Sequence, residues 1–309
     1  MNYDLDPRVM AILRCPHCRQ ELVRSSDGRF SCRSCDALYG WSKTGSLDLR
    51  LRKPKPVELR FDIAPSHHLT EIPWHEELPA NPTPSVDFGD TRPPIHLSKA
   101  LMSYFPRAAG KDSLMLDLGC GDTVHRQVCE RAGFFYVGVD IDNPKAQYLA
   151  DAHALPFRDD SFDFLLSISV LEHIQFPFVV AREAYRVLRP GGLFVGSAAF
   201  LEPFHGNSFY HQSRLGILNT LLYGGFEILQ VAASTTWTVF KAQAHMEAAD
   251  YFPRTPRVLS SNLILLPQIM SRLWWRVGLL LKPNLRSARS SLTERNAGAF
   301  YFVAKKADT

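Results

Sequence analysis

A short loop-forming segment, residues 116–122, constrains the fold of this chain more than any other feature. Its sequence is Leu-Asp-Leu-Gly-Cys-Gly-Asp, an apolar strand that ends in an acidic residue and two closely spaced glycines. Gly119 and Gly121 allow the backbone to turn tightly and to approach a ligand without an intervening Cβ. A second apolar segment ends at Asp140, at a spacing suited to an acidic residue that binds ribose hydroxyls. The pattern predicts a nucleotide-binding loop between a buried strand and a helix over residues 123–132.

Two details distinguish the expected ligand from a dinucleotide. A dinucleotide-binding loop carries a third glycine that brings helix and strand together around a pyrophosphate, and Val124 occupies that position here. Asp117 would repel a pyrophosphate but suits a ligand that carries an ammonium and a sulfonium group. From Asp117 to Gly121 the chain resembles the class I S-adenosylmethionine-dependent methyltransferases, whose first motif is E/D-x-G-x-G. The resemblance implies an α/β fold with a Rossmann-like, seven-stranded sheet.

The resemblance covers almost all of residues 113–200 and is to methyltransferases of type 11. Residues 150–157 are similar to the third-strand motif, residues 160–167 to the fourth strand, and residues 170–174, which contain Leu-Glu-His, to the turn after it. Residues 182–195 are similar to the helix, the Arg-Pro-Gly-Gly turn and the fifth strand that follow. Proline cannot continue a helix and glycine adopts a left-handed C-cap, so the helix is expected to end at that turn.

The resemblance also implies which residues bind the cofactor, S-adenosylmethionine. Asp140 is expected to bind the ribose hydroxyls and Asp151 the adenine amino group, with the backbone of Ala152 against the ring. The full set that the resemblance implies is Asp117, Gly119, Cys120, Gly121, Asp140, Ile141, Asp151, Ala152 and Ser167. Only a few residues separate Asp140 from the next strand, about residues 146–150, so the usual helix there is shortened or missing. The wall beside the adenine and ribose is therefore expected to be more open than in the family.

A second strong pattern lies near the beginning of the chain. Two Cys-x-x-Cys pairs, separated by a hairpin-length segment, comprise Cys15, Cys18, Cys32 and Cys35. Each pair forms a tight knuckle whose thiolates converge on one ion, so the spacing predicts a tetrahedral zinc site with a structural role. Residues 6–49 also resemble the small zinc-ribbon proteins that partner tRNA and protein methyltransferases. We therefore expect a zinc-ribbon module over residues 1–52.

The proline-rich residues 53–94 are expected to link this module to a methyltransferase domain over residues 95–309. This linker also carries several aromatic and histidine side chains: Phe61, His67, His68, Trp74 and His75. Two interpretations stay open. These side chains pin the linker against the catalytic domain, or part of the linker forms a lid over the cofactor. An apolar helix over residues 95–105 is expected to cover the cofactor pocket.

The loop after the fifth predicted strand, residues 202–213, is rich in histidine, tyrosine and amide side chains. Acceptors lie over the carboxyl ends of the strands in these methyltransferases, so this loop is the expected acceptor site. Its side chains suit a polyhydroxy or carboxylate acceptor. The candidate catalytic residues, as bases or as hydrogen-bonding partners of the acceptor, are His173, His205, Tyr210 and His211. Whether a general base is used depends on the acceptor atom, which stays open.

A long insertion is expected near the end of the chain. Residues 226–232 predict the sixth strand and residues 299–304 an antiparallel seventh, so residues 235–296 form a helical insertion between them. Its centre, residues 258–282, mixes leucines and two tryptophans with arginines, and Pro267 divides it. The pattern fits an interfacial membrane helix, a cover over the acceptor site or a dimer contact.

Charge and hydropathy set limits on partners and location. A formal net charge of +4 is too mild and too evenly spread to indicate nucleic acid by itself. No apolar stretch is long and clean enough for a transmembrane helix. A cytoplasmic protein is expected, with peripheral membrane contact through residues 258–282 as an alternative.

Together these features predict S-adenosylmethionine-dependent methyl transfer to a small-molecule, glycan or lipid-linked acceptor. One alternative is an rRNA or tRNA methyltransferase that uses its zinc ribbon for RNA binding, although the ribbon lacks a concentrated Lys/Arg stripe. Another alternative is a non-catalytic zinc-ribbon scaffold. The intact Asp117-x-Gly-x-Gly loop, Asp140 and Asp151 argue against the scaffold. The oligomeric state stays open.

Overall fold

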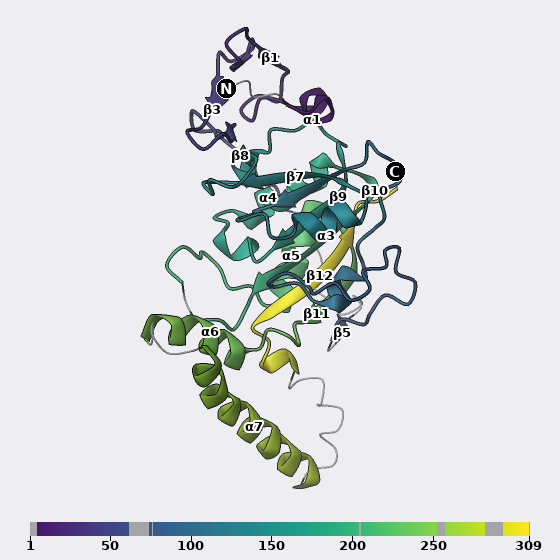
Figure 1. The fold of residues 1–309 in the computed structure, drawn as a ribbon, viewed down its shortest axis with the longest axis vertical. Helices are drawn as coiled ribbons and strands as arrows, with labels where there is room; N and C mark the ends of the chain where they lie inside the picture. The colour runs from purple at the N-terminus through teal and green to yellow at the C-terminus, as the bar shows by residue number, and fades with distance from the viewer. Residues whose placement is uncertain are drawn as a thin grey trace.

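A computed structural model describes residues 5–61, 74–75, 77–203, 205–251, 257–281 and 293–308 of the chain (Figure 1). One sheet runs through its centre. The central strands are, in order of pairing, β8 (Tyr148–Leu149), β7 (Phe135–Asp140), β6 (Leu114–Leu118), β9 (Phe162–Ile168), β10 (Leu188–Ala199), β12 (Ala299–Lys305) and β11 (Glu227–Ala233). The first five are parallel, and β12 is antiparallel to both of its neighbours. This is the Rossmann-like α/β fold that the sequence predicts.

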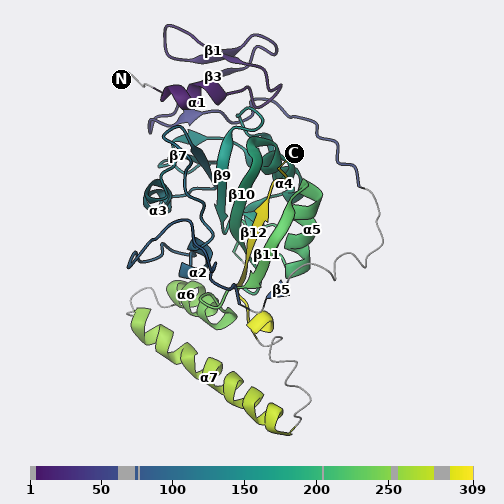
Figure 2. The same cartoon turned by 90° about the vertical axis from the view of Figure 1, so that its right-hand side faces the viewer.

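Helices cover both faces of the sheet, as parallel strands without a solvent-facing side require. All five residues of β6 are buried, so both faces of this strand are covered by other parts of the chain. One face packs against α4 (Pro177–Val187) and α5 (Arg214–Gly224). The other face packs against α2 (Lys99–Met102) and α3 (Arg126–Arg131), and Figure 2 shows the two layers of helices on opposite sides of the sheet.

Local chemistry explains where α4 and α5 begin and end. α4 begins at Pro177, earlier than the predicted start at Arg182, because the fixed φ of proline suits the first turn of a helix. Ser213 caps α5 by accepting a hydrogen bond from the N–H of Gly216, and Gly225 ends the helix with a φ of 99°. The predicted turn at residues 189–192 lies within β10, where the pairing with β9 is irregular.

Two predicted helices are shorter than expected. α3 begins at Arg126 rather than near residue 123, because residues 121–125 form turns in which Thr123 has a φ of 59°. The helix therefore does not start directly after the glycine loop. In the predicted helix over residues 95–105, only the four residues of α2 are helical. Residues 141–147 contain no helix, as the short connection between β7 and β8 predicts.

The N-terminal region extends the central sheet. It contains α1 (Pro7–Ile12) and the short strands β1 (Leu22–Arg24), β2 (Phe30–Cys32), β3 (Leu38–Trp41) and β4 (Leu47–Asp48). These strands pair antiparallel in succession, and β4 then pairs parallel with β8. The N–H of Leu49 donates to the carbonyl oxygen of Leu149 at 2.7 Å. The sheet is therefore wider than the seven strands predicted.

Hydrophobic side chains of the N-terminal region and the central sheet form one continuous core. Val9, Phe30 and Leu47 are buried in the same cluster as Leu114 and Val139. Residues 1–52 were expected to form a small module of their own, joined to the larger domain by the linker. The shared core means that the two parts stabilise each other directly.

A buried carboxylate also joins the two parts. Glu183, on α4, accepts a hydrogen bond from the guanidinium of Arg19 at 2.8 Å and another from the backbone N–H of Leu155 at 2.9 Å. Arg186 completes the network with an ion pair to Glu183 at 2.7 Å. Because Arg19 directly follows Cys18, this network connects a cysteine knuckle to the sheet domain.

The described parts of the linker lie against the central sheet and its helices. β5 (Trp74–His75) pairs parallel with β11 and adds a strand at the far edge of the sheet. The ring of Phe61 lies 4.5 Å from the ring of Tyr223 on α5, between centroids, and Phe88 is buried. These contacts support the interpretation that the linker is pinned. His67 and His68 lie outside the described residues.

Two helices, α6 (Val239–Tyr251) and α7 (Arg257–Leu281), lie between β11 and β12. They project from the end of the molecule opposite the N-terminal region (Figure 1). Their base is closed by a hydrogen bond from the N–H of Gly298 to the carbonyl oxygen of Trp237 at 2.9 Å. α7 continues through Pro267, which the sequence interpretation expected to divide it. Within the described residues, none of the helices has the length and apolar character needed to cross a bilayer.

Candidate active site

A pocket of about 400 Å³ opens at the carboxyl edge of the sheet, where β6, β7, β8 and β9 end. This volume lies within the range of small-molecule binding sites. The pocket is lined by five of the predicted cofactor residues: Gly119, Asp140, Ile141, Asp151 and Ala152. The structure therefore brings together residues from three separate loops that the sequence pattern associates with one ligand.

The glycine loop comes close to the turn after β9. Gly119 has a φ of 72°, and a Cβ at this position would lie only 2.4 Å from Cγ2 of Val170. Its N–H donates to the carbonyl oxygen of Val139 at 2.8 Å, which fixes the loop against the end of β7. Gly121 has a φ of 48°, but a Cβ there would meet no atom within 4 Å. Close approach therefore requires glycine at position 119 more strictly than at position 121.

Asp140, the last residue of β7, is held in place by backbone groups. Its Oδ2 accepts a hydrogen bond from the N–H of Gly121 at 3.0 Å, and its Oδ1 accepts from the N–H groups of Asp142 and Asn143, both at 3.2 Å. A carboxylate offers about four acceptor sites, so these three bonds orient the group and leave capacity for a ligand. Asp140 is thus a preorganised acceptor at the wall of the pocket.

Asp151 and His153 form a second oriented pair in the pocket wall. The Oδ1 of Asp151 lies 2.6 Å from Nδ1 of His153 and 2.9 Å from its backbone nitrogen. Because the N–H of Phe176 donates to Nε2 of His153 at 3.1 Å, the neutral ring carries its proton on Nδ1. Burial alone would raise the pKa of Asp151, but the hydrogen bonds from His153 lower this pKa overall. Asp151 therefore stays ionised as an acceptor.

Asp117, one of the predicted cofactor residues, lies outside the pocket lining. Neighbouring side chains of a strand point to opposite faces, so Asp117 lies on the other face from Leu118, which lines the pocket. Its Oδ2 accepts a hydrogen bond from the hydroxyl of Tyr136 at 2.7 Å and lies 3.6 Å from Nδ1 of His125. Burial lowers the pKa of His125, but the bond to Asp117 raises it overall. Asp117 therefore makes buried contacts with Tyr136 and His125 inside the protein.

Three other predicted cofactor residues also lie outside the lining: Cys120, Gly121 and Ser167. Cys120 is buried, and Gly121 acts on the pocket through its bond to Asp140. Ser167 lies inside β9 and is fully buried, whereas Ser169, which follows the end of that strand, lines the pocket.

The loop after β10 closes one side of the pocket. Asn207 and Phe209 line the pocket, together with His173 from the turn after β9. The N–H of Phe209 donates to the carbonyl oxygen of Glu172 at 2.7 Å, and Nδ1 of His173 donates to the carbonyl oxygen of Asn207 at 3.1 Å. Sequence reasoning selected the histidines and the tyrosine of this loop but missed Asn207 and Phe209, which nothing in their local pattern distinguishes.

Three predicted catalytic histidines gather beside the pocket. The ring of His205 lies 4.9 Å from that of His173 and 5.5 Å from that of His211, between centroids. Burial lowers the pKa of His211, and the charge of His205 lowers it further. Of the three, only His173 lines the pocket, and Tyr210, which is 49% exposed, does not line it.

Glu172, which follows the pocket residue Val170 by two positions, is a buried carboxyl group that sequence reasoning did not select. It is 1% exposed, and its Oε2 has no hydrogen-bonding partner among the described residues. Burial raises the pKa of Glu172 to about 7, and the nearby charge of Glu202 contributes to the rise. A buried acid that has one oxygen without a partner and such a pKa, beside a pocket, is a candidate for proton transfer.

Replacing Glu172 with glutamine is expected to change the pH dependence of stability. The pKa of Glu172 is raised to about 7 in the folded chain, so its ionisation destabilises the fold as the pH rises from about 4.5 to about 7. The loss is on the order of 3 kcal/mol, because each pKa unit corresponds to about 1.4 kcal/mol. Urea unfolding of Glu172→Gln across this range should lack that loss. Glu227→Gln, at an exposed position, is the control and should still lose stability as the pH rises. Equal pH profiles of stability for Glu172→Gln and the parent chain would contradict the assignment.

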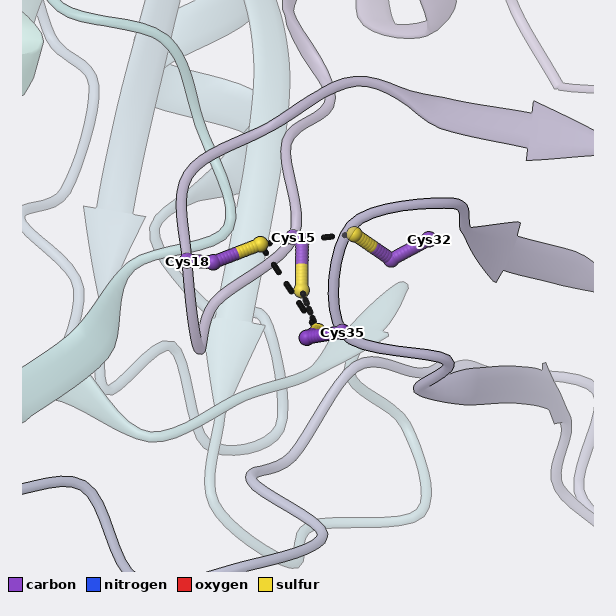
Figure 3. A group of neighbouring side chains, drawn as sticks. All are labelled: Cys15, Cys18, Cys32 and Cys35. Carbon is purple, nitrogen blue, oxygen red and sulfur yellow. Dashed lines mark hydrogen bonds between the residues drawn. The ribbon is translucent and has the colours of Figure 1, made fainter.

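The four predicted zinc ligands converge in the N-terminal region (Figure 3). Their Sγ atoms lie within 4.8 Å of one another, with Cys18 at 3.3 Å from Cys32 and 3.6 Å from Cys35. A tetrahedral zinc with bonds of about 2.3 Å places its sulfurs about 3.8 Å apart, whereas a disulfide requires about 2.05 Å. The thiols therefore fit one metal ion and not two disulfides.

Both cysteine pairs adopt the same knuckle. The residue after the second cysteine of each pair has a positive φ, 64° at Arg19 and 56° at Asp36. Its N–H donates to the carbonyl oxygen of the first cysteine, at 2.7 Å in the first knuckle and 2.9 Å in the second. This turn brings the two thiols of a pair to one side, so that four sulfurs enclose a single position.

Comparison with known proteins concerns the part of the chain that forms the pocket. Residues 116–196 match the sequence profile of the family described as "Methyltransferase domain". An uncharacterised methyltransferase of Mycobacterium marinum is 37% identical over 107 residues, which are 30% of this chain and 42% of that protein. One of Mycobacteroides abscessus is 33% identical over 130 residues, which are 37% of this chain and 50% of that protein. The match thus spans half or less of these relatives.

A solved structure of phosphoethanolamine N-methyltransferase 2 from Haemonchus contortus, in complex with S-adenosyl-L-methionine, is 19% identical in sequence to this chain. The similar region covers 67% of this chain and 51% of the Haemonchus contortus chain, with a TM-score of 0.43. The family match covers most of β6, all of β7, β8 and β9, and part of β10, and the pocket opens at the ends of β6 to β9. Residues 116–196 are therefore similar to a methyltransferase domain.

Proposed function

We propose that this chain transfers a methyl group from S-adenosylmethionine to a small-molecule, glycan or lipid-linked acceptor. The observation that carries the proposal is the pocket at the carboxyl edge of the sheet, in which Gly119, Asp140 and Asp151 converge. Two oriented carboxylates on adjacent strands suit the ribose hydroxyls and the adenine amino group of a nucleoside.

The residues present fit this cofactor. Asp140 would accept hydrogen bonds from the ribose hydroxyls, since three backbone N–H groups already orient it. Asp151 would accept from the adenine amino group, because its interaction with His153 keeps it ionised. Gly119 allows close contact with the loop backbone. When bound, the cofactor supplies a methyl group on a sulfonium, which is electrophilic without further activation.

The acceptor would lie between the cofactor pocket and the loop that contains Asn207 and Phe209. Holding an acceptor atom in line with the methyl group and the sulfur can supply most of the acceleration of such a transfer. An acceptor hydroxyl also benefits from a base. His173 is the candidate for that role, since it lines the pocket and His205 lies beside it. Asn207 and the neighbouring imidazoles suit an acceptor that carries hydroxyl or carboxylate groups.

We also propose that Cys15, Cys18, Cys32 and Cys35 hold one structural zinc ion. Four thiolates complete a tetrahedral coordination sphere, so the site has no open position for water or substrate. Cys15 and Cys32 are buried in the core that the N-terminal region shares with the sheet. A metal at this site would therefore fix the geometry of the sheet edge rather than take part in methyl transfer.

Asp140→Ala and His205→Ala are expected to separate cofactor binding from acceptor chemistry. Asp140→Ala removes bonds to the ribose that are worth about 1.5–3 kcal/mol each, so the affinity for S-adenosylmethionine should fall on the order of 100-fold. His205→Ala should leave that affinity within about twofold and lower methyl transfer, since His205 lies beside the acceptor side of the pocket. Calorimetry gives the affinity, and incorporation of labelled methyl groups into fractionated extracts gives the transfer.

Asp122→Ala is the matched control for the cofactor side. It removes a carboxyl group that directly follows the glycine loop, from an exposed residue that does not line the pocket. Unchanged affinity in Asp140→Ala, or no heat of binding in the parent chain, would refute the proposed cofactor site. Unchanged transfer in folded His205→Ala would move the acceptor away from this loop.

A further inference from the structure

The long helix α7 exposes a continuous apolar face. Trp274 is 81% exposed and Leu280 is 79% exposed, values that are unusual for large apolar side chains in a folded protein. The exposed residues include Leu266, Met270, Leu273, Trp274, Val277 and Leu280. They recur at intervals of three or four, so they occupy one side of the helix, over an arc of about 120°. This is the face of an amphipathic helix that lacks a described partner.

Charge on α7 is entirely positive. Arg257, Arg272 and Arg276 lie in the helix, and none of its residues is Asp or Glu. Arg272 and Arg276 are exposed and lie along one flank of the apolar face, on the spacing of an ideal helix. Tryptophan and leucine on one face with arginine at its border is the pattern of a helix that lies in the interface of an anionic membrane. Arginine on its long side chain can reach phosphate while the apolar face enters the acyl region.

The place of α7 in the fold relates this face to the pocket. β11 is parallel to β10, because both are antiparallel to β12. The insertion that carries α7 therefore leaves the sheet at the carboxyl edge, the same edge at which the pocket opens. A hydrogen bond from the indole N–H of Trp237 to Glu202 joins the start of the insertion to the loop after β10. A partner surface bound to α7 would thus face the carboxyl edge of the sheet, where the proposed acceptor would enter the pocket.

We propose that α7 docks this protein on an anionic lipid surface, with its apolar face in the headgroup region and Arg272 and Arg276 on lipid phosphates. The helix lies on the membrane and does not cross it, in agreement with the absence of a membrane-spanning helix from the described residues. A second copy of the chain fits this face less well. It would bring the arginines of two α7 helices together without a carboxylate on either helix to pair with them.

Flotation of the full chain with lipid vesicles tests the proposal without any measurement of methyl transfer. The chain should bind vesicles of phosphatidylcholine mixed with phosphatidylglycerol and bind pure phosphatidylcholine much less. Leu273→Ser combined with Leu280→Ser should weaken binding on the order of 100-fold, because each leucine contributes roughly tenfold when buried. Arg272→Gln combined with Arg276→Gln should weaken it on the order of tenfold, and added salt should weaken the binding of the parent chain.

Leu215→Ser is the matched control, because Leu215 is 47% exposed and lies on the separate helix α5. It should bind like the parent chain. All substituted side chains are exposed, so circular dichroism should report folded protein in each case. Equal binding to both kinds of vesicle, or unchanged binding in the double leucine variant, would overturn the proposal. Sedimentation could also overturn it. The contradicting result would be a parent chain that forms a dimer and does not bind vesicles, together with a double leucine variant that is a monomer.

Discussion

Gly119→Ala is expected to abolish measurable binding of S-adenosylmethionine and to lower the free energy of unfolding by about 2–5 kcal/mol. The new Cβ would lie 2.4 Å and 2.7 Å from the two γ-carbons of Val170, and the backbone at position 119 has a φ of 72°. Valine is branched at Cβ and has few alternative rotamers, so it cannot easily move aside. The loop would have to shift away from the turn that forms the opposite wall of the pocket.

Two further variants separate the causes of that effect. Gly121→Ala adds the same methyl group in the same loop, with a φ of 48°, but it meets no atom within 4 Å. It should cost about 1 kcal/mol through the backbone alone. Adding Val170→Ala to Gly119→Ala should recover the part of the loss that is due to contact. Urea unfolding and calorimetry measure the two quantities, and equal losses in Gly119→Ala and Gly121→Ala would contradict the role of close approach.

Removal of zinc is expected to unfold the N-terminal region and to destabilise the whole sheet. Structural zinc sites in small peptides contribute on the order of 10 kcal/mol at pH 7. Here the proposed ligands Cys15 and Cys32 are buried in the core that contains Leu47 and Leu114, so the loss would not stay local. Loss of β4 would also break the backbone bonds to β8, the strand that precedes Asp151 in the pocket wall. Chelation should therefore lower both the melting temperature and the affinity for S-adenosylmethionine.

Elemental analysis and a chelator titration measure this outcome. The parent chain should contain one zinc ion, and Cys32→Ser combined with Cys35→Ser should contain none. Cys129→Ser removes a buried thiol that lies outside the four-cysteine cluster and should retain the metal. Full zinc content in the double cysteine variant would disprove the site. An unchanged melting temperature after complete removal of the metal would show that the core is not coupled to it.

Local patterns predicted the parts of this molecule that depend on neighbouring residues in the chain. The glycine loop, the strand ends at Asp140 and close to Ala150, and the two cysteine knuckles each follow from a short segment with a definite geometric requirement. The sixth and seventh strands were also expected close to their observed limits. In each case the physical constraint acts within about ten residues, which a sequence pattern can express.

Other features depend on contacts between distant residues and were missed. The side chain of Asp117 bonds to Tyr136 and lies close to His125, and no motif indicates which face of β6 it occupies. β4 pairs with β8, and β5 pairs with β11, over only two residues each. Glu172 belongs to a recognised turn, but its burial results from how the loop after β10 packs over it. These outcomes follow from tertiary packing, which overrides local preference.

The pairing of β4 with β8 also has a consequence for the order of folding. Leu47 pairs with Tyr148, so the last strand of the N-terminal region finds its partner about one hundred residues later in the chain. During synthesis, the cysteine knuckles can close on a metal long before that partner emerges, but β4 must wait with its outer edge unpaired. Contacts of such long range slow folding, because the entropy of closing the loop is lost before the contact is gained. A metal captured early would hold β4 in its final shape through that interval. The preformed strand would then offer a ready edge with which β8 can pair.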